Sequence, residues 1–478
     1  MNIVVWDIET DSSNTFFGTI IEIGAILIND NFQELDKLNI RCRLPEGVVP
    51  QAGALLVNQS NVSMLTKANY SHYQMLQEVE ATFKKWSPAV FLGYSNINFD
   101  DEMLRKEFFK GLRQPYLTNT NGNKRQDGLN IVRAAFAVNN KIMKTETNEK
   151  GNAVMKLESL ARMNGIESGG AHNALFDANL TKLVLEKIYK EQNVTWKSAM
   201  MTGSREEVER FSRDELMFSL NEYFYGKSKL YLVTPLHPEH MLHPIYKWVQ
   251  AFDLRFDPEI YFDLPLNELK SEMKKTPKFI RTIRSNKAPV LLHLDYACKV
   301  DPYVAISKDV LTKRAKAIKA NKDFCGRITL ALAEIAQEKR DTGDQSDITP
   351  EESIYLKFVD NKETPKMEKW HQASWEDKFK LLDKFEDERL VDFGKKIIYQ
   401  EAPQVLPDSV IKEIKRGIAK RILSTNKEKW TTCSDFYSEC DHFREKFSNE
   451  NNEEKLSFLA EINKFVESIE KKYESEIF

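Results

Sequence analysis

The stretch that decides the fold is the start of the chain, Met1-Asn2-Ile3-Val4-Val5-Trp6-Asp7-Ile8-Glu9-Thr10. Its apolar run predicts a buried strand that ends in two carboxylates, Asp7 and Glu9. Residues two apart in an extended chain point to the same face, so both carboxylates project together. Adjacent like charges at the rim of a core are costly unless a cation lies between them, and oxygen ligands favour Mg²⁺ or Mn²⁺. An isolated Asp-x-Glu pair more often faces water, so a metal site requires partners elsewhere in the chain.

The size and composition of the chain indicate a soluble protein with several domains. A chain of 478 residues is too long for one ordinary core, so we expect two or three domains. The sequence has no run of eighteen apolar residues and no basic segment leading into an apolar one, so we expect no membrane association. Five scattered cysteines without a Cys-x-x-Cys pair favour a reduced, cytoplasmic location.

The charge of the chain is unevenly distributed along the sequence. The net charge is −3, yet residues 270–327 contain fifteen Lys and Arg against five Asp and Glu, a local excess of +10. A basic segment in an otherwise acidic protein is what a local track for a polyanion would need. A solvated helix face is an equally good explanation of this segment taken alone.

The first 195 residues predict an α/β domain. Residues 19–29 and 38–44 read as strands that follow the first one through short loops, which favours an antiparallel meander. Residues 89–94 form another short apolar strand. Residues 71–86, 127–138, 156–163 and 172–191 have the spacing or end signals of helices. Strands flanked by helices in this way define an α/β domain over residues 1–195.

The rest of the chain predicts two further domains. Short β-like runs at 229–233, 278–283 and 290–294, followed by helices over 307–339, indicate a smaller mixed domain over residues 196–345. The sequence Thr349-Pro350-Glu351-Glu352 is typical of a capped helix start. From there the pattern is helical and highly charged, which predicts a helical domain over residues 346–478.

Three more polar side chains complete the set that begins with Asp7 and Glu9. The apolar strand at 89–94 is followed by Asp100 at a predicted helix start. His172 precedes Asp177 by five positions, near the start of the helix predicted over 172–191. Each residue has an ordinary structural explanation on its own, as a helix cap or a surface side chain. The ordered set of four carboxylates and one histidine, each at the end of an element, is far more specific.

This ordered set resembles the DEDDh exonucleases, which have ribonuclease-H-like folds. Residues 91–102 (FLGYSNINFDDE), 156–160 (KLESL), 164–168 (NGIES) and 286–291 (NKAPVL) are similar to bacterial exonuclease I. The resemblance implies a ribonuclease H-like exonuclease domain with a mixed sheet, an SH3-like α+β domain and a helical C-terminal domain. Lys156 departs from the family, where an arginine is expected, and a lysine lacks the bidentate grip of arginine on a phosphate.

The resemblance also implies an activity. It predicts a magnesium-dependent 3′→5′ exodeoxyribonuclease that degrades single-stranded DNA to 5′-mononucleotides in DNA repair and recombination. Two Mg²⁺ ions about 4 Å apart, which Mn²⁺ could replace, would be held by Asp7, Glu9, Asp100 and Asp177. His172 would accept the proton of the attacking water.

The resemblance further implies a track for the DNA strand and a set of partners. Single strands bind where cations accompany aromatic side chains. We therefore expect the strand to contact Lys156, Lys274, Lys275, Lys278, Arg281, Arg284 and Lys287. We also expect a monomer, with a single-stranded DNA-binding protein as a partner and no contact with membranes.

Two other functions remain open at this point. One is a DEDDh exoribonuclease, although such enzymes are usually little more than the nuclease domain. The other is a catalytically silent nucleic-acid-binding scaffold, which has no reason to keep all five polar groups. Hydrolysis of end-labelled DNA and RNA separates the three hypotheses.

Overall fold

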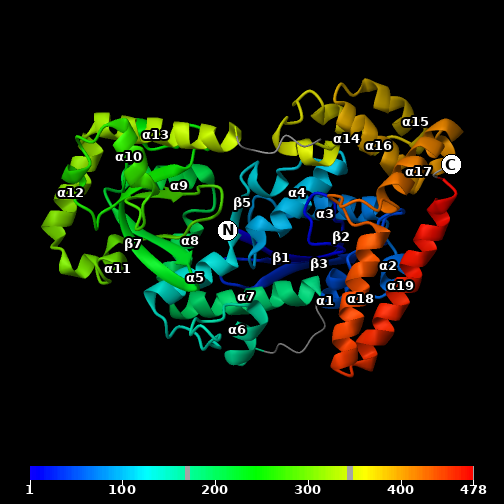
Figure 1. The fold of residues 1–478 in the computed structure, drawn as a ribbon, viewed down its shortest axis with the longest axis horizontal. Coiled ribbons are helices and arrows are strands. Elements are labelled where there is room, and N and C mark those ends of the chain that lie inside the picture. Colours follow the sequence, from blue (N-terminus) through cyan, green and yellow to red (C-terminus); the bar gives the residue numbers. More distant parts are fainter. Residues whose placement is uncertain (167–172, 342–347, 477–478) are drawn as a thin grey trace.

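The first part of the chain folds around a five-stranded mixed sheet with the order β3-β2-β1-β4-β5 (Figure 1). The computed structural model describes residues 1–166, 173–341 and 348–476. β1 pairs antiparallel with β2, which pairs antiparallel with β3, so the predicted meander is confirmed. β1 also pairs parallel with β4, and β4 with β5. The strands are β1 (Asn2–Thr10), β2 (Ile20–Ile28), β3 (Glu34–Arg41), β4 (Ala89–Gly93) and β5 (Lys124–Asp127).

Helices cover both faces of this sheet because its central strand is apolar on both sides. Ile3 and Val5 face the cluster that contains α5 and α7, and Val4 and Trp6 face the cluster that contains α3 and α4. Ser71 begins α3 with a capping box. The helices of this part are α1 (Ala52–Asn58), α2 (Val62–Lys67), α3 (His72–Trp86), α4 (Asp100–Lys110), α5 (Gly128–Val138), α6 (Leu157–Met163), α7 (Ala174–Glu191) and α8 (Asn193–Met200).

A second five-stranded sheet, entirely antiparallel, has the order β10-β6-β7-β8-β9. Its strands are β6 (Phe218–Phe224), β7 (Lys227–Pro235), β8 (Val249–Asp253), β9 (Ile280–Ile283) and β10 (Leu291–Leu292). The accompanying helices are α9 (Arg205–Asp214), α10 (Leu266–Lys274), α11 (Leu294–Ala297), α12 (Lys308–Ala320) and α13 (Lys322–Asp341). The hydrophobic cluster beneath α5 and α7 continues into this sheet, so the two sheets share one core.

The described residues beyond 347 are helical and pack against the first part of the chain. The helix expected at Thr349 is a short 3₁₀ helix, η6 (Pro350–Tyr355), and it has the predicted capping box. The α-helices are α14 (Thr364–Gln372), α15 (Trp375–Leu381), α16 (Glu388–Glu401), α17 (Asp408–Ile422), α18 (Cys433–Asn449) and α19 (Glu453–Glu474). Tyr399 and Tyr473 donate their hydroxyls to one oxygen of Glu46, at 2.6 and 2.7 Å. This carboxylate therefore fastens two helices to the loop after β3.

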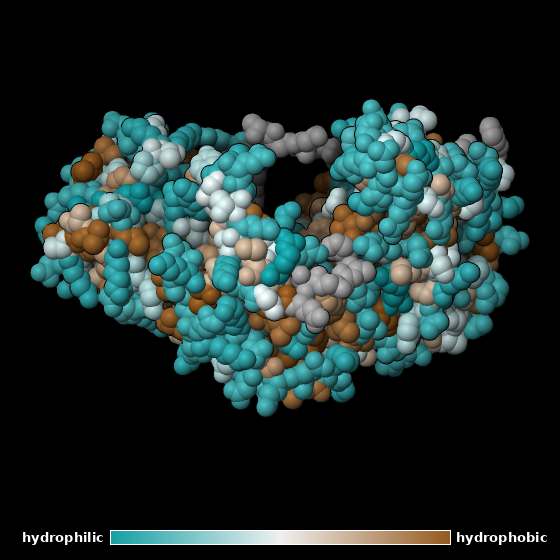
Figure 2. Space-filling view, turned by 90° about the horizontal axis from the view of Figure 1, so that it is seen from below, coloured by the Kyte–Doolittle hydropathy of each residue, from teal (hydrophilic) through white to brown (hydrophobic). Residues whose placement is uncertain are grey.

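The surface of the molecule is hollowed (Figure 2), and its cysteines are unpaired. Figure 2 shows an opening near the middle of the molecule, between the part that contains the second sheet and the helical part. Within the described ranges, no helix combines the length and the apolar character that crossing a membrane requires. All five cysteines are free thiols.

Candidate metal centre

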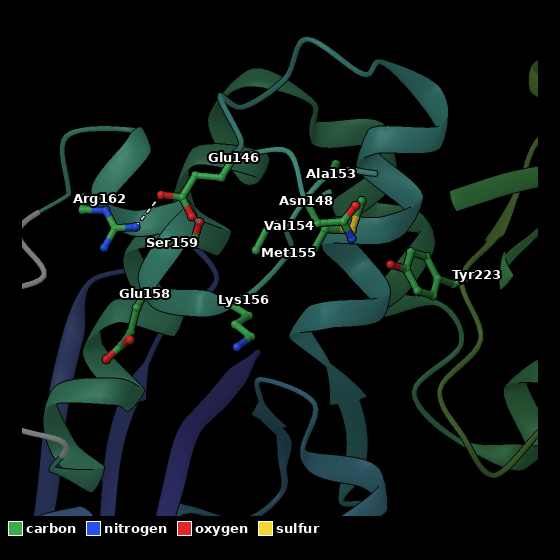
Figure 3. Close-up of a pocket in the computed structure, with 10 residues that line it drawn as sticks. All are labelled: Glu146, Asn148, Ala153, Val154, Met155, Lys156, Glu158, Ser159, Arg162 and Tyr223. Atoms are coloured by element: carbon green, nitrogen blue, oxygen red, sulfur yellow. Dashed lines mark hydrogen bonds and ion pairs between the residues drawn. The ribbon is translucent and has the colours of Figure 1, made fainter. Parts of the chain in front are cut away.

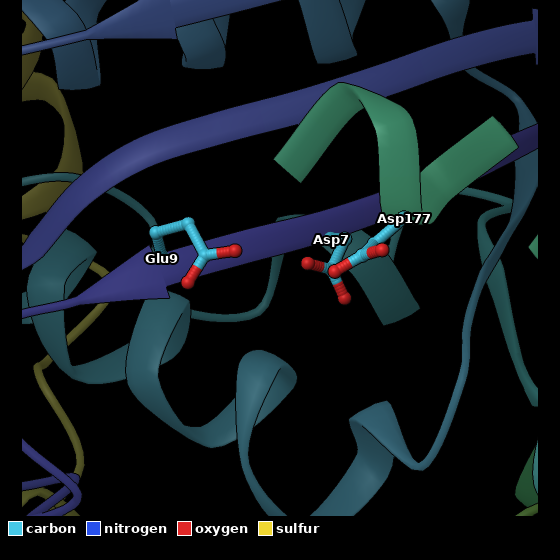
Figure 4. Close-up of side chains that lie close together, drawn as sticks. All are labelled: Asp7, Glu9 and Asp177. Carbon is cyan, nitrogen blue, oxygen red and sulfur yellow. The ribbon is translucent and has the colours of Figure 1, made fainter. Parts of the chain in front are cut away.

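β1 brings its two carboxylates to the site from one face of the strand. Asp7 lies opposite Gly24 of β2, and Glu9 lies opposite Glu22. The first turn of α7 supplies Asp177. One carboxylate oxygen from each of Asp7, Glu9 and Asp177 lies within 4.8 Å of the other two (Figure 4). Three of the residues proposed from the sequence therefore converge in space.

Asp100 lies beside this group and not within it. It is the first residue of α4 and is buried, as the strand-then-helix pattern predicted. Its charge acts on Asp7, so the two carboxylates are close enough to repel one another. His172, the fifth member of the predicted set, lies outside the described residues.

The electrostatics of the group show why a cation fits there. Burial raises the pKa of Asp7 well above its ordinary value, and the charge of Asp100 is the next cause. Burial and the charge of Asp177 raise the pKa of Glu9 to about 8. Burial, opposed in part by a backbone hydrogen bond and reinforced by the charge of Asp101, raises the pKa of Asp100. Partly buried carboxylates that repel one another in this way are the donor set that hard divalent cations bind.

Glu22 is a buried carboxylate at the site that the sequence did not reveal. One oxygen accepts a hydrogen bond from Asn173 at 2.6 Å, and the other forms an ion pair with Arg41. Asn173 in turn accepts from the backbone N–H of Phe176 and so begins α7. Glu22 therefore ties the start of the helix that carries Asp177 to the neighbouring strand. A lone glutamate in the otherwise apolar run 20–28 was the available signal.

Gly24 allows α7 to approach the sheet closely. A Cβ atom at this position would lie 2.0 Å from the backbone nitrogen of Leu175 and 2.2 Å from the carbonyl carbon of Ala174. No side chain fits at these distances. The first turn of α7 can therefore lie against β2 only because the residue beneath it is glycine.

Asp127 caps the start of α5, the helix predicted over residues 127–138. Its carboxylate accepts hydrogen bonds from the backbone N–H groups of Leu129 at 2.9 Å and Asn130 at 3.4 Å. It also accepts from the N–H of Ser95 at 3.1 Å, just after β4. It therefore joins the starts of α5 and of the segment that leads to Asp100.

Four of the lysines proposed to contact DNA are exposed, and they lie on two parts of the molecule. Lys156 immediately precedes α6 in the first part of the chain. Lys274 and Lys275 end α10 and form ion pairs with Glu338, at 3.9 Å, and Glu272. Lys278 is exposed just before β9. Lys274, Lys275 and Lys278 are thus separate from the side chains that converge at Asp7, Glu9 and Asp177.

The remaining predicted contacts differ in whether other groups of the protein already engage their charge. Arg281 pairs with Glu222 at 2.7 Å and Asp253 at 3.3 Å, so the second sheet already uses its charge. Arg284 is exposed and lies over the ring of Trp248. Lys287 donates to the carbonyl of Ile97 at 3.4 Å, close to the start of α4. Lys287 of the basic segment therefore reaches the first part of the chain.

A mixed sheet flanked by helices, with carboxylates at the ends of β1 and the starts of α4 and α7, defines an exonuclease-type α/β protein. The family model for exonucleases matches residues 4–185, and the model for the exonuclease I C-terminal domain matches residues 348–469. Together the two models match well over half of the chain. The chain belongs to the bacterial exonuclease I family.

Individual relatives and solved structures agree with this assignment. Exodeoxyribonuclease I of Buchnera aphidicola (Schizaphis graminum) is 28% identical over 194 residues, which is 40% of this chain and 40% of the relative. Exonuclease I of Methylocaldum szegediense has a TM-score of 0.80 at 19% identity, and Escherichia coli exonuclease I in complex with a dA16 oligonucleotide has 0.79 at 17%. Each structural match covers 98% of this chain and 99% of the other. The predicted fold class, α/β with a mixed sheet followed by a helical C-terminal region, is confirmed.

The stability of the metal-free protein is expected to fall as the pH rises. The pKa of Glu9 is about 8 in the folded chain and near 4.5 in the unfolded one, so the folded state holds an extra proton between these values. Raising the pH removes this proton from a buried, repulsive site. Thermal unfolding in EDTA at about pH 6 and about pH 9 measures the effect. Glu9→Gln should lose less stability over this range than the wild type, and an equal loss would contradict the assignment.

Proposed function

We propose that the chain is a magnesium-dependent 3′→5′ exodeoxyribonuclease that degrades single-stranded DNA to 5′-mononucleotides, with a role in DNA repair and recombination. The observation that carries the proposal is the convergence of Asp7, Glu9 and Asp177 within 4.8 Å, with Asp100 beside them, in an exonuclease-type fold. Family membership supports the reaction. The Escherichia coli neighbours include complexes with single-stranded oligonucleotides, which supports the substrate.

The carboxylates are proposed to hold two Mg²⁺ ions, which Mn²⁺ could replace. One Escherichia coli neighbour is a zinc-bound form of an exonuclease I–ssDNA complex, which supports a divalent ion. When bound, such ions stabilise the negative charge that develops on the phosphodiester and its leaving oxygen. Asp7 is proposed as the central ligand because the charges of Asp100, Glu9 and Asp177 all act on it. Its loss would therefore disturb the whole site.

His172 is proposed as the general base. This role rests on the His-x4-Asp motif, since the residue lies outside the described ranges. A histidine has an ordinary pKa near 6.5 and can take a proton from the attacking water near neutral pH. Asn173 follows it directly and is held by Glu22, which gives the base a fixed neighbour.

We propose that the three parts of the chain, 1–195, 196–345 and 346–478, are separate domains with different roles. The first part hydrolyses the strand, and the other two hold it. The exposed cations Lys156, Lys274, Lys275, Lys278 and Arg284, together with Lys287, are the proposed phosphate contacts. Arg281 contributes through the sheet that its ion pairs stabilise. One similar solved structure is an ExoI/SSB-Ct complex, so a single-stranded DNA-binding protein is the proposed partner of a monomeric enzyme.

The test is hydrolysis of end-labelled strands by the purified full chain. Single-stranded DNA, duplex DNA and RNA of one sequence, each labelled at the 3′ or the 5′ end, are incubated with Mg²⁺, Mn²⁺ or EDTA. We expect Mg²⁺-dependent release of a labelled mononucleotide first from the 3′-labelled single-stranded DNA. Preferred hydrolysis of RNA would indicate an exoribonuclease. Binding without hydrolysis in either metal would indicate a silent scaffold.

A further inference from the structure

The tip of the β6–β7 hairpin exposes three consecutive aromatic side chains. Tyr223 is 37% exposed, Phe224 51% and Tyr225 85%. The rings of Phe224 and Tyr225 lie 4.2 Å apart, edge to face, so they form one exposed unit. Large aromatic side chains seldom gather in water at a hairpin tip without a ligand, because their burial elsewhere would stabilise the fold.

The turn itself is unfavourable for the residue that occupies it. Phe224 pairs with Lys227, so Tyr225 and Gly226 form a two-residue turn, with φ of 49° and 79°. Such turns favour Asn, Asp or Gly, because other L residues are strained at positive φ. Gly226 meets this requirement and Tyr225 does not. Strain held at an exposed position points to a function for the side chain.

The surroundings of the hairpin are suited to an anionic ligand. A cavity of about 500 Å³, lined by Tyr223 and Lys156, opens beside it (Figure 3). Arg133 lies 4.0 Å from the ring centre of Tyr223 and fixes that ring. Lys227 and Lys229, which follow the aromatic residues, are exposed, and no carboxylate among the described residues pairs with either. Glu158 also lines the cavity, and Glu146 there is engaged by Arg162 at 2.5 Å.

A hydrogen bond joins the wall of the cavity to the residue that follows β4. The hydroxyl of Tyr94 donates to the carbonyl of Met155 at 2.6 Å, directly before Lys156. Tyr94 follows β4, and the same segment continues to Asp100. The wall of the cavity is therefore joined by a hydrogen bond to the segment that leads from β4 to Asp100.

We propose that the tip formed by Phe224 and Tyr225 is a stacking platform for the bases of a single-stranded polynucleotide whose 3′ end lies in the candidate metal centre. The proposal rests on the proposed function and adds a binding site to it. Bases of any sequence stack on aromatic rings, and lysines beside the rings attract the phosphates. A single strand satisfies both features, whereas an apolar peptide would leave Lys227 and Lys229 without a role.

The test separates the effect of an aromatic ring at position 225 from the effect of side-chain size. Binding of 5′-fluorescein-labelled oligothymidylates is measured by anisotropy in EDTA, with one strand of about 4 nucleotides and one of about 30. We expect Tyr225→Phe to bind the long strand like the wild type and Tyr225→Leu to bind it about tenfold more weakly, because leucine keeps the apolar bulk and loses the ring. The short strand, which reaches only the metal centre, should bind all three proteins equally.

Tyr225→Asn separates binding from folding. Asparagine tolerates positive φ, so this variant should unfold at the same temperature as the wild type or higher, while it binds the long strand more weakly. Controls are Ile260→Ala, 69% exposed in the same part of the chain, and Tyr70→Ala, 40% exposed, in the first part. Both should bind normally.

Two results would overturn the proposal, and they differ in meaning. If the wild type binds the long strand and Tyr225→Leu binds it equally well, the platform is wrong and the proposed function stands. That result would instead favour an apolar protein partner at the tip. If the wild type binds no single strand at all, both the platform and the proposed function fail.

Discussion

Asp7→Asn is expected to lower kcat for hydrolysis of single-stranded DNA by at least about 10³-fold, because Asp7 is the proposed central metal ligand. The charges of Asp100, Glu9 and Asp177 all act on this side chain. Steady-state hydrolysis of a 3′-labelled strand in Mg²⁺ measures the loss.

The same variant should be more stable than the wild type when metal is absent. Asparagine has no charge, so the repulsion among the buried carboxylates is reduced, and thermal unfolding in EDTA at about pH 8 should occur at a higher temperature. Asp30→Asn is the control. This carboxylate is 67% exposed, and its ion pair is with the N-terminal amino group of Met1. Full activity of Asp7→Asn would refute the metal site. Loss of activity together with a lower unfolding temperature in EDTA would also contradict the prediction, because the variant is expected to be more stable than the wild type.

Gly24→Ala is expected to have the second largest effect, at a residue that touches no substrate. The added methyl group would meet the backbone of Leu175 and Ala174 at distances no Cβ atom tolerates, so α7 must move away from β2. Overpacking of this kind typically costs about 1–3 kcal/mol. The movement displaces Asp177 from Asp7 and Glu9, and a misplacement of about 1 Å can cost about 10²-fold in rate. Thermal unfolding and kcat, measured together, test both consequences.

Gly417→Ala is the matched control for this substitution. Gly417 lies within α17, and a Cβ atom there would meet nothing within 4 Å. Alanine favours a helix over glycine by about 1 kcal/mol, so this variant should be as stable as the wild type or more stable, with unchanged activity. Equal behaviour of the two alanine variants would show that the close approach of α7 to β2 has no bearing on the site.

The order of elements in the first part of the chain could be predicted because its signals are local. The apolar run before Asp7, the capping residues at Ser71 and Asn173 and the start of α4 at Asp100 all lie within a few residues of the feature they define. The convergence of Asp7 and Asp177 is not local. It followed from the family resemblance, and the structure supplies the distance.

Glu22 and Arg281 show what local signals cannot give. The position of Glu22 opposite Glu9 depends on the register between β1 and β2, which the sequence does not state. Arg281 counted as one more free cation in a basic segment, whereas Glu222 and Asp253 neutralise it from β6 and β8. Neither β6 nor β8 was predicted. In β6, buried residues are combined with an exposed, aromatic end.

The contact of Glu46 with Tyr473 has a consequence for synthesis of the chain. The two residues are 427 positions apart, yet the hydroxyl of one is bonded to the carboxylate of the other. At about 5–20 residues per second, a ribosome adds the second residue roughly 20–90 s after the first. Throughout that interval the loop that contains Glu46 lacks its partner, so the nascent chain cannot be fully assembled before translation has almost finished.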